Sequence, residues 1–98
     1  MPRGAKSDPG LLTNEVAAIL RAQMARKQLI QGAVAEEAGL SQAQLSGILN
    51  GHKHIDIEQL DRLCYALGLT LRDVVGEADE ATTARYLEPG WPTKPLSS

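Results

Sequence analysis

Apolar residues recur every three or four positions along most of the chain, which is the spacing of one face of an α-helix. The first stripe of this kind consists of Val16, Ile19, Leu20 and Met24. Thr13 or Asn14 can cap the start of this helix, because a short side-chain oxygen accepts from an orphan N–H of the first turn. The pattern breaks near residues 29–30 and predicts a second helix over residues 31–38.

Three more helices follow from the same spacing. A third, over residues 42–50, has Ser41 as its cap and an inward face of Leu45, Ile48 and Leu49. A fourth begins after Asp56, with an apolar stripe of Ile57, Leu60, Leu63, Cys64 and Leu67. A short fifth helix begins after Thr70, with Leu71, Val74 and Val75 facing inward.

Beyond Gly76 the composition changes. Residues 77–80 are acidic and can extend into a short helix that reaches Leu87, whereas the prolines at 89, 92 and 95 break regular structure. The sequence therefore predicts an arm over residues 1–11, a domain over 12–76 and a tail over 77–98. The fold class is all-α, with five short helices and an irregular C-terminal tail.

Composition excludes several classes of protein. A chain of 98 residues with 43% apolar and 22% charged residues has the balance of one small globular domain. No apolar run approaches the roughly 20 residues that span a bilayer, and residues 1–10 lack the apolar stretch of a secretory signal. The single cysteine, Cys64, cannot form an internal disulfide, which fits a reducing cytoplasm. On its apolar stripe it is expected to be a small core residue.

Charge is unevenly distributed along the chain. Residues 1–55 hold six Lys or Arg against four Asp or Glu, a net of +2, whereas residues 56–98 hold four against eight, a net of −4. The overall charge of −2 argues weakly against nucleic acid. The asymmetry nevertheless places a candidate interaction face in the first half.

The most informative segment is QGAVAEEAGLSQAQLSGILNG, residues 31–51. Two helices joined by the three-residue turn Gly39-Leu40-Ser41 need a small residue where they cross, here Ala35, and a glycine at the turn, here Gly39. Apolar side chains must also pack beneath the pair, as Leu45 and Ile48 are placed to do.

This segment resembles the helix-turn-helix of the Cro/phage-repressor (XRE) family. The resemblance rests on the polar start at Gln31, the alanine and glycine just named, an aliphatic Leu45 at the centre of the recognition helix and the pair Asn50-Gly51 after it. The following aliphatic-Gly-aliphatic step at residues 66–69 agrees as well. The resemblance covers about residues 12–76 and implies a lambda-repressor-like fold.

The resemblance also implies a function, in which the third helix docks in the major groove of double-stranded DNA. It assigns base contacts to the N-terminal and outward part of that helix. It assigns phosphate contacts to Gln31 and to the loop that follows the third helix. The DNA-binding residues expected in this way are Gln31, Ser41, Gln42, Ala43, Gln44, Ser46, Gly47, Asn50, His52, Lys53 and His54. Glutamine suits the N6/N7 edge of adenine, and alanine can touch a thymine methyl.

The sequence departs from the family pattern in two places on this helix. Gly47 occupies a position where the family often has a long polar side chain, and no arginine is present for a bidentate contact with guanine. With a negative overall charge, nonspecific affinity should be modest and salt-sensitive. Specificity is then expected from a few glutamine contacts, from DNA shape and from a homodimer.

Several other features of the sequence allow two interpretations. Arg3 and Lys6 can track DNA as a basic arm or belong to a plain terminus. His52 and His54 lack a third metal ligand nearby in sequence, and the pair Glu36-Glu37 lacks a nucleophile or pocket.

The tail around Trp91 can bind a protein partner or the other subunit, or can be an unstructured end. The sequence thus predicts a cytoplasmic, non-enzymatic transcriptional regulator without cofactor, metal or membrane contact. This regulator binds a pseudo-palindromic operator as a homodimer. The alternative is a protein-interaction module, for example an antitoxin-like protein.

Overall fold

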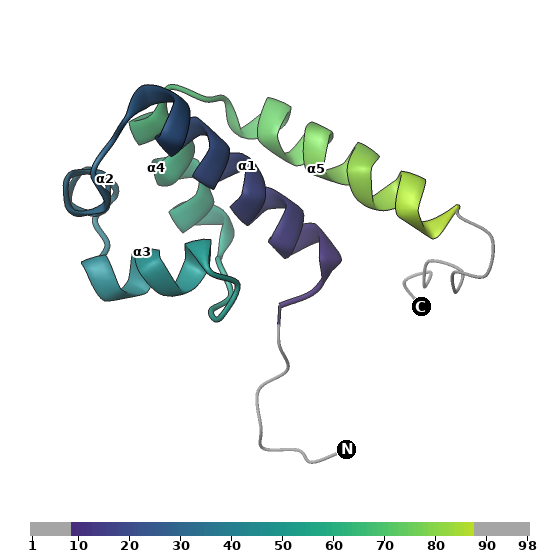
Figure 1. Cartoon of the computed structure of the whole chain (residues 1–98), viewed down its shortest axis with the longest axis horizontal. Helices are drawn as coiled ribbons and strands as arrows, with labels where there is room; N and C mark the ends of the chain where they lie inside the picture. The colour runs from purple at the N-terminus through teal and green to yellow at the C-terminus, as the bar shows by residue number, and fades with distance from the viewer. Residues whose placement is uncertain (1–8, 88–98) are drawn as a thin grey trace, which may run out of the picture.

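The computed structural model describes residues 9–87 of the chain. These residues contain five α-helices and no strand (Figure 1). In chain order they are α1 (Leu11–Lys27), α2 (Gln31–Ala38), α3 (Gln42–Leu49), α4 (Ile57–Leu67) and α5 (Leu71–Tyr86). The predicted all-α class is confirmed. The length of two helices is not as predicted, because α1 and α5 have 17 and 16 residues and are not short.

Side-chain caps fix the starts of the last three helices where the sequence predicts them. Ser41, Asp56 and Thr70 each accept a hydrogen bond from the backbone N–H three residues later. Left-handed glycines at residues 39 and 68 end α2 and α4, each with φ 74°. The third helix ends at Leu49, and Asn50 is its C-cap instead of its last residue.

The start of α1 differs from the prediction. The helix begins at Leu11 with Gly10 as its N-cap, so Thr13 and Asn14 lie inside the first turn. The expected side-chain cap is therefore wrong, because the N-cap is a glycine and has no side chain to accept from the first turn. At the other end Gln28 adopts the left-handed conformation, with φ 55° and ψ 45°, and its N–H bonds back to the helix.

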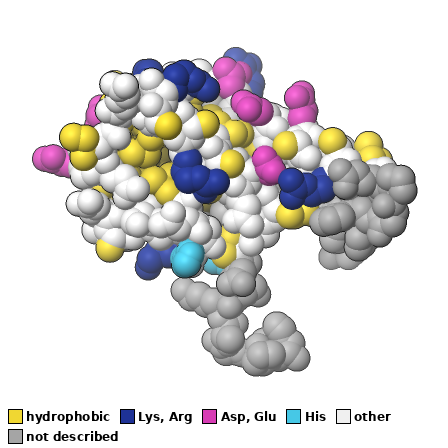
Figure 2. Space-filling model, in the orientation of Figure 1, with side chains coloured by type: hydrophobic (Ala, Val, Ile, Leu, Met, Phe, Trp, Pro, Cys, Tyr) yellow, Lys and Arg dark blue, Asp and Glu magenta, His cyan; other side chains and the backbone are white. Residues whose placement is uncertain are grey.

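The core is aliphatic and lies between all five helices. The buried leucines include Leu20, Leu45, Leu63 and Leu67, and Cys64 is buried among them as predicted. Ile57 does not belong to this set, because 66% of its surface is exposed. It lies in the first turn of α4 at the edge of the apolar stripe, whereas Leu60 in the same turn is buried. On the face shown in Figure 2, charged side chains of both signs are interspersed over the upper part of the molecule.

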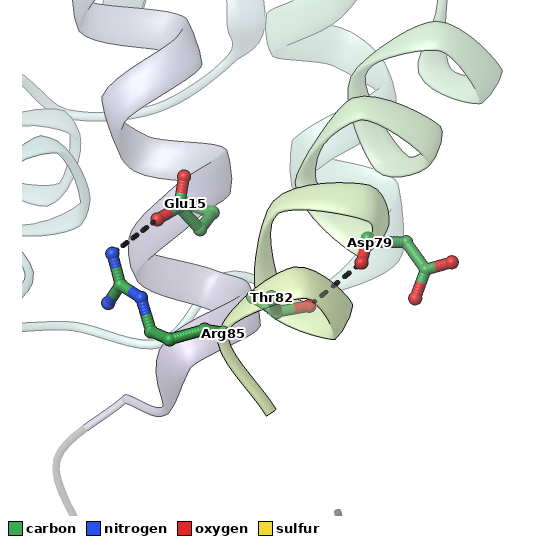
Figure 3. A network of polar contacts seen from close by, with 4 residues as sticks. All are labelled: Glu15, Asp79, Thr82 and Arg85. Carbon is green, nitrogen blue, oxygen red and sulfur yellow. Dashed lines mark hydrogen bonds and ion pairs between the residues drawn. The ribbon is translucent and has the colours of Figure 1, made fainter. Parts of the chain in front are cut away.

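α5 is one continuous helix that runs through Gly76 against α1 (Figure 1). The two helices are antiparallel, and Ala78 and Thr82 on α5 are buried. At the end of the pair, Arg85 Nη2 lies 3.5 Å from Glu15 Oε2 in an ion pair, and Thr82 Oγ1 donates to the carbonyl of Asp79 at 3.1 Å (Figure 3). The acidic segment after Gly76 therefore continues the fifth helix and does not start a separate one. Its buried positions lie on the same face of the helix as Val74.

Candidate nucleic-acid interface

The corner between α2 and α3 has the geometry that the sequence predicts. Gly39 turns the chain, and the N–H of Leu40 bonds to the carbonyl of Ala35 at 2.8 Å. Ala35 is 2% exposed, so the two helices cross where a larger side chain would separate them. From α4, Arg62 Nε donates to the carbonyl of Ala38 at 2.9 Å and closes the open end of α2. The turn is thus fixed both by its own backbone and by a neighbouring helix.

The first turn of α3 is held by a capping box. Ser41 Oγ accepts from the N–H of Gln44 at 3.0 Å, and Gln44 Oε1 accepts from the N–H of Ser41 at 2.8 Å. The carbonyl oxygen of the Gln44 side chain is therefore engaged within the helix. Its amide NH₂ group is the part left to meet a ligand.

The outward face of α3 is polar and small. Leu45, Ile48 and Leu49 are buried, which leaves the opposite side to solvent. On that side Gln42, Ala43 and Gln44 are exposed, and Ser46 and Gly47 are half-buried. The structure thus brings the predicted residues of this helix onto one accessible surface.

The N-terminus of α2 adjoins the first side chain of α3. A Cβ on Gly32 would lie 3.5 Å from Gln42 Oε1, which places the Gln42 amide beside the start of α2. Gln31, the first residue of α2, is half-buried at this junction. The orphan N–H groups at the start of a helix suit an anion such as phosphate, and here they lie next to a predicted base-contacting residue.

The loop after α3 carries the remaining predicted residues. Gly51 has φ 78°, and the N–H groups of His52 and Lys53 both bond to the carbonyl of Gly47, at 2.8 and 3.1 Å. Asn50, which is exposed, donates from Nδ2 to Ser46 Oγ at 3.3 Å. The side chains of residues 52–54 are exposed as well. Figure 2 shows histidine side chains beside a Lys or Arg side chain at the lower edge of the molecule, where α3 and this loop lie.

Part of the expected interface lies outside the described residues. This is so for Arg3 and Lys6 of the predicted basic arm and for Trp91 of the tail. Within residues 9–87, no three His, Cys, Asp or Glu side chains are grouped to hold a metal ion. None of the described helices has the length and apolar content needed to cross a membrane.

Comparison with known proteins agrees with this geometry. The family model for the Cro/C1-type HTH DNA-binding domain matches residues 20–76, more than half of the chain. The chain belongs to the Cro/C1-type helix-turn-helix family. It is therefore a DNA-binding protein of the type found in transcriptional regulators.

Solved structures of Cro/C1-type regulators have the same fold. The clp gene regulator ClgR from Corynebacterium glutamicum is 33% identical over 78% of this chain and 96% of that chain, with a TM-score of 0.65. The restriction-modification controller protein C.Esp1396I, solved as a tetramer on its natural 35 base-pair operator, is 17% identical over 74% and 95%, also with a TM-score of 0.65. At that identity the second likeness shows the fold alone. A search of curated proteins gave no match.

Two arginines that support this Cro/C1-type motif were not predicted. Arg21 of α1 donates from Nη1 to the carbonyl of Leu49, the last residue of α3, and Arg62 closes α2 in the same way. Each cation meets the negative end of a helix of the motif. Both arginines lie on polar positions of their own helices, so the sequence pattern does not distinguish them from solvated charges.

Proposed function

We propose that the protein is a transcriptional regulator that binds a pseudo-palindromic DNA operator as a homodimer, with α3 in the major groove. The observation that carries this proposal is the exposed polar face of α3, set at a fixed angle to α2. Gln42 and Gln44 begin this face, and α3 has no charged residue of its own. Amide groups on a rigid helix match the donors and acceptors of base edges.

Phosphate contacts flank the groove-facing helix in this proposal. Gln31 lies at the start of α2, where helix N–H groups point outward. Asn50, His52 and His54 lie on the loop at the other end of α3. Contacts at both ends of a recognition helix fix its register on the duplex without specifying sequence.

A second copy of the chain completes the proposed complex. α3 has eight residues and only a few polar side chains on its outward face, so one copy supplies few base contacts. Two half-sites about one helical turn apart roughly double the contact energy. The tetramer of C.Esp1396I on its operator shows that a protein of this fold assembles on DNA.

The function is tested by selecting bound sequences from random duplexes and then titrating the selected duplex at several salt concentrations. We expect one enriched palindromic site and a log Kd that changes linearly with log salt, with a slope of about 0.9 per phosphate contact. Tight binding that ignores salt, or no enrichment of any sequence, would contradict the proposal. The alternative, a protein-interaction module, predicts the absence of enrichment.

The proposal also includes where the protein acts in the cell and what its C-terminal tail does. We expect the regulator to act in the cytoplasm, where its DNA is, and to need no cofactor or catalytic step. Contact of a protein partner with residues 77–98 also stays a prediction. Most of that segment, residues 88–98, lies outside the described part of the chain.

A further inference from the structure

The centre of the outward face of α3 is built from small residues. Ala43 and Gly47 are four positions apart, so they lie one above the other on the side opposite Leu45 and Leu49. Gly47 offers no side chain to a ligand. A helix that faces DNA here would leave a gap unless another part of the chain fills it.

Lys53 fills that space. A Cβ placed on Gly47 would lie 2.8 Å from Cγ, 2.7 Å from Cδ and 3.0 Å from Cε of Lys53. These distances are too short for real carbon contacts, so the lysine stem occupies the volume that a side chain at residue 47 would take. The backbone supports this placement, because the N–H of Lys53 bonds to the carbonyl of Gly47 at 3.1 Å.

The ammonium group is available to a ligand. Lys53 is exposed and makes no ion pair or hydrogen bond through its side chain with any residue from 9 to 87. Because the whole stem from Cγ to Cε runs along Gly47, the charge stays near the outward face of α3. A lysine that reached sideways to a phosphate would leave the helix surface earlier along its stem.

We propose that Lys53 contacts a base edge in the major groove from across Gly47, and so acts as a specificity-determining residue of this interface. The inference rests on the proposed function and deepens it. The acceptor that suits a lysine ammonium best is guanine, with O6 and N7 side by side on the groove edge. Gly47 is then a requirement for the contact, because any side chain there displaces the lysine.

The test compares the sequences selected by wild type, Lys53→Ala, Lys53→Arg and Gly47→Ala. We expect wild type to prefer guanine at one base pair of each half-site by roughly 5- to 150-fold. Lys53→Ala should lose that preference and keep the others, and Lys53→Arg should retain it. Gly47→Ala should lose it too, and should add nothing further in the Lys53→Ala background.

The control is Lys27→Ala, which removes an exposed lysine at the end of α1 and should leave the selected sequence unchanged. Thermal melting checks that each variant folds, and Lys53→Ala alone decides the proposal if Gly47→Ala does not fold. If Lys53→Ala weakens all sequences alike and every base preference survives, the lysine contacts phosphate and the inference is wrong. If wild type itself selects no sequence, the proposed function is wrong, and the inference about Lys53 is wrong with it.

Discussion

Ser41 and Gln44 exchange two hydrogen bonds across the first turn of α3, each side chain bonding to the other residue's backbone N–H. The pair fixes where the recognition helix begins and how its first side chains point. It also ties a residue expected to contact DNA to the stability of the helix. Effects of substitutions at Gln44 on stability and on DNA binding therefore need to be measured separately.

Ser41→Ala should lower the free energy of unfolding by about 1 kcal/mol, because an N–H of the first turn loses its acceptor. Urea denaturation measures the change. Gln44→Glu is the matched control, since its carboxylate can still accept from the N–H of Ser41, and it should stay close to wild type. Equal stability of Ser41→Ala and wild type would show that the Ser41 hydroxyl contributes nothing to helix stability in solution.

Gln42→Ala should weaken binding to the selected operator by about 1–3 kcal/mol and leave binding to random DNA unchanged. The reason is that the exposed Gln42 amide lies beside the N-terminus of α2, where it can meet a base edge. Fluorescence anisotropy on both duplexes measures the two affinities. Equal losses on both would mean that Gln42 does not contact a base.

Arg21→Met should loosen the end of α3, because the carbonyl of Leu49 loses a charged donor while the aliphatic stem is kept. The bond is partly exposed, so we expect a loss of about 1 kcal/mol in stability. Hydrogen exchange should become faster at the last amides of α3. Arg72→Met removes an exposed arginine of α5 and serves as the control. Identical exchange in both variants would exclude a role of Arg21 at this helix end.

Gln28→Gly should stabilise the protein by about 1 kcal/mol. The φ of 55° at this position strains any residue that has a Cβ, and glycine adopts it without that strain. For a domain of this size that is roughly 4–8 °C in Tm. Gln28→Ala keeps the Cβ and should give no gain. A rise in Tm for both variants would point to a cause other than the backbone conformation.

Stability should fall at alkaline pH because of Cys64. Burial raises the pKa of its thiol above the ordinary value, and the negative charge of Asp61 raises it further. The neutral thiol therefore favours the folded state. Its contribution is complete below the ordinary thiol pKa of about 8.5 and is lost as pH rises through the higher folded value.

Unfolding free energies between pH 8 and 10.5 test this dependence. Cys64→Ala should be less stable at neutral pH, since it leaves a cavity, but it should lose less stability than wild type as pH rises. The difference in slope isolates the thiol from other groups that titrate in this range. Parallel curves for the two proteins would contradict the raised pKa.

The sequence predicts most of the local structure because local chemistry decides it. The caps Ser41, Asp56 and Thr70 are polar residues directly before an apolar stripe, and Gly39 and Gly68 directly follow one. Each of these signals depends on residues within one helical turn.

The errors arise where packing between distant helices decides the outcome. The change of composition at Gly76 predicts the end of the domain and of its fifth helix. In the structure α5 continues through Gly76, because Ala78 and Thr82 are buried against α1. Ile57 fits the spacing of the α4 stripe but lies at its edge and is exposed, although Leu60 in the same turn is buried. The contact of Lys53 with Gly47 joins a loop to a helix face, and no periodic pattern contains that information.

Docking of α3 on DNA can be tested by mapping the surface of the protein that the duplex covers. Backbone amide shifts of isotope-labelled protein, recorded as the selected duplex is added, give that surface residue by residue. We expect the largest changes at the start of α2, along α3 and over residues 50–54, with small changes on the outer faces of α4 and α5. Large changes on α4 with an unchanged α3 would mean that α3 is not the helix that binds DNA.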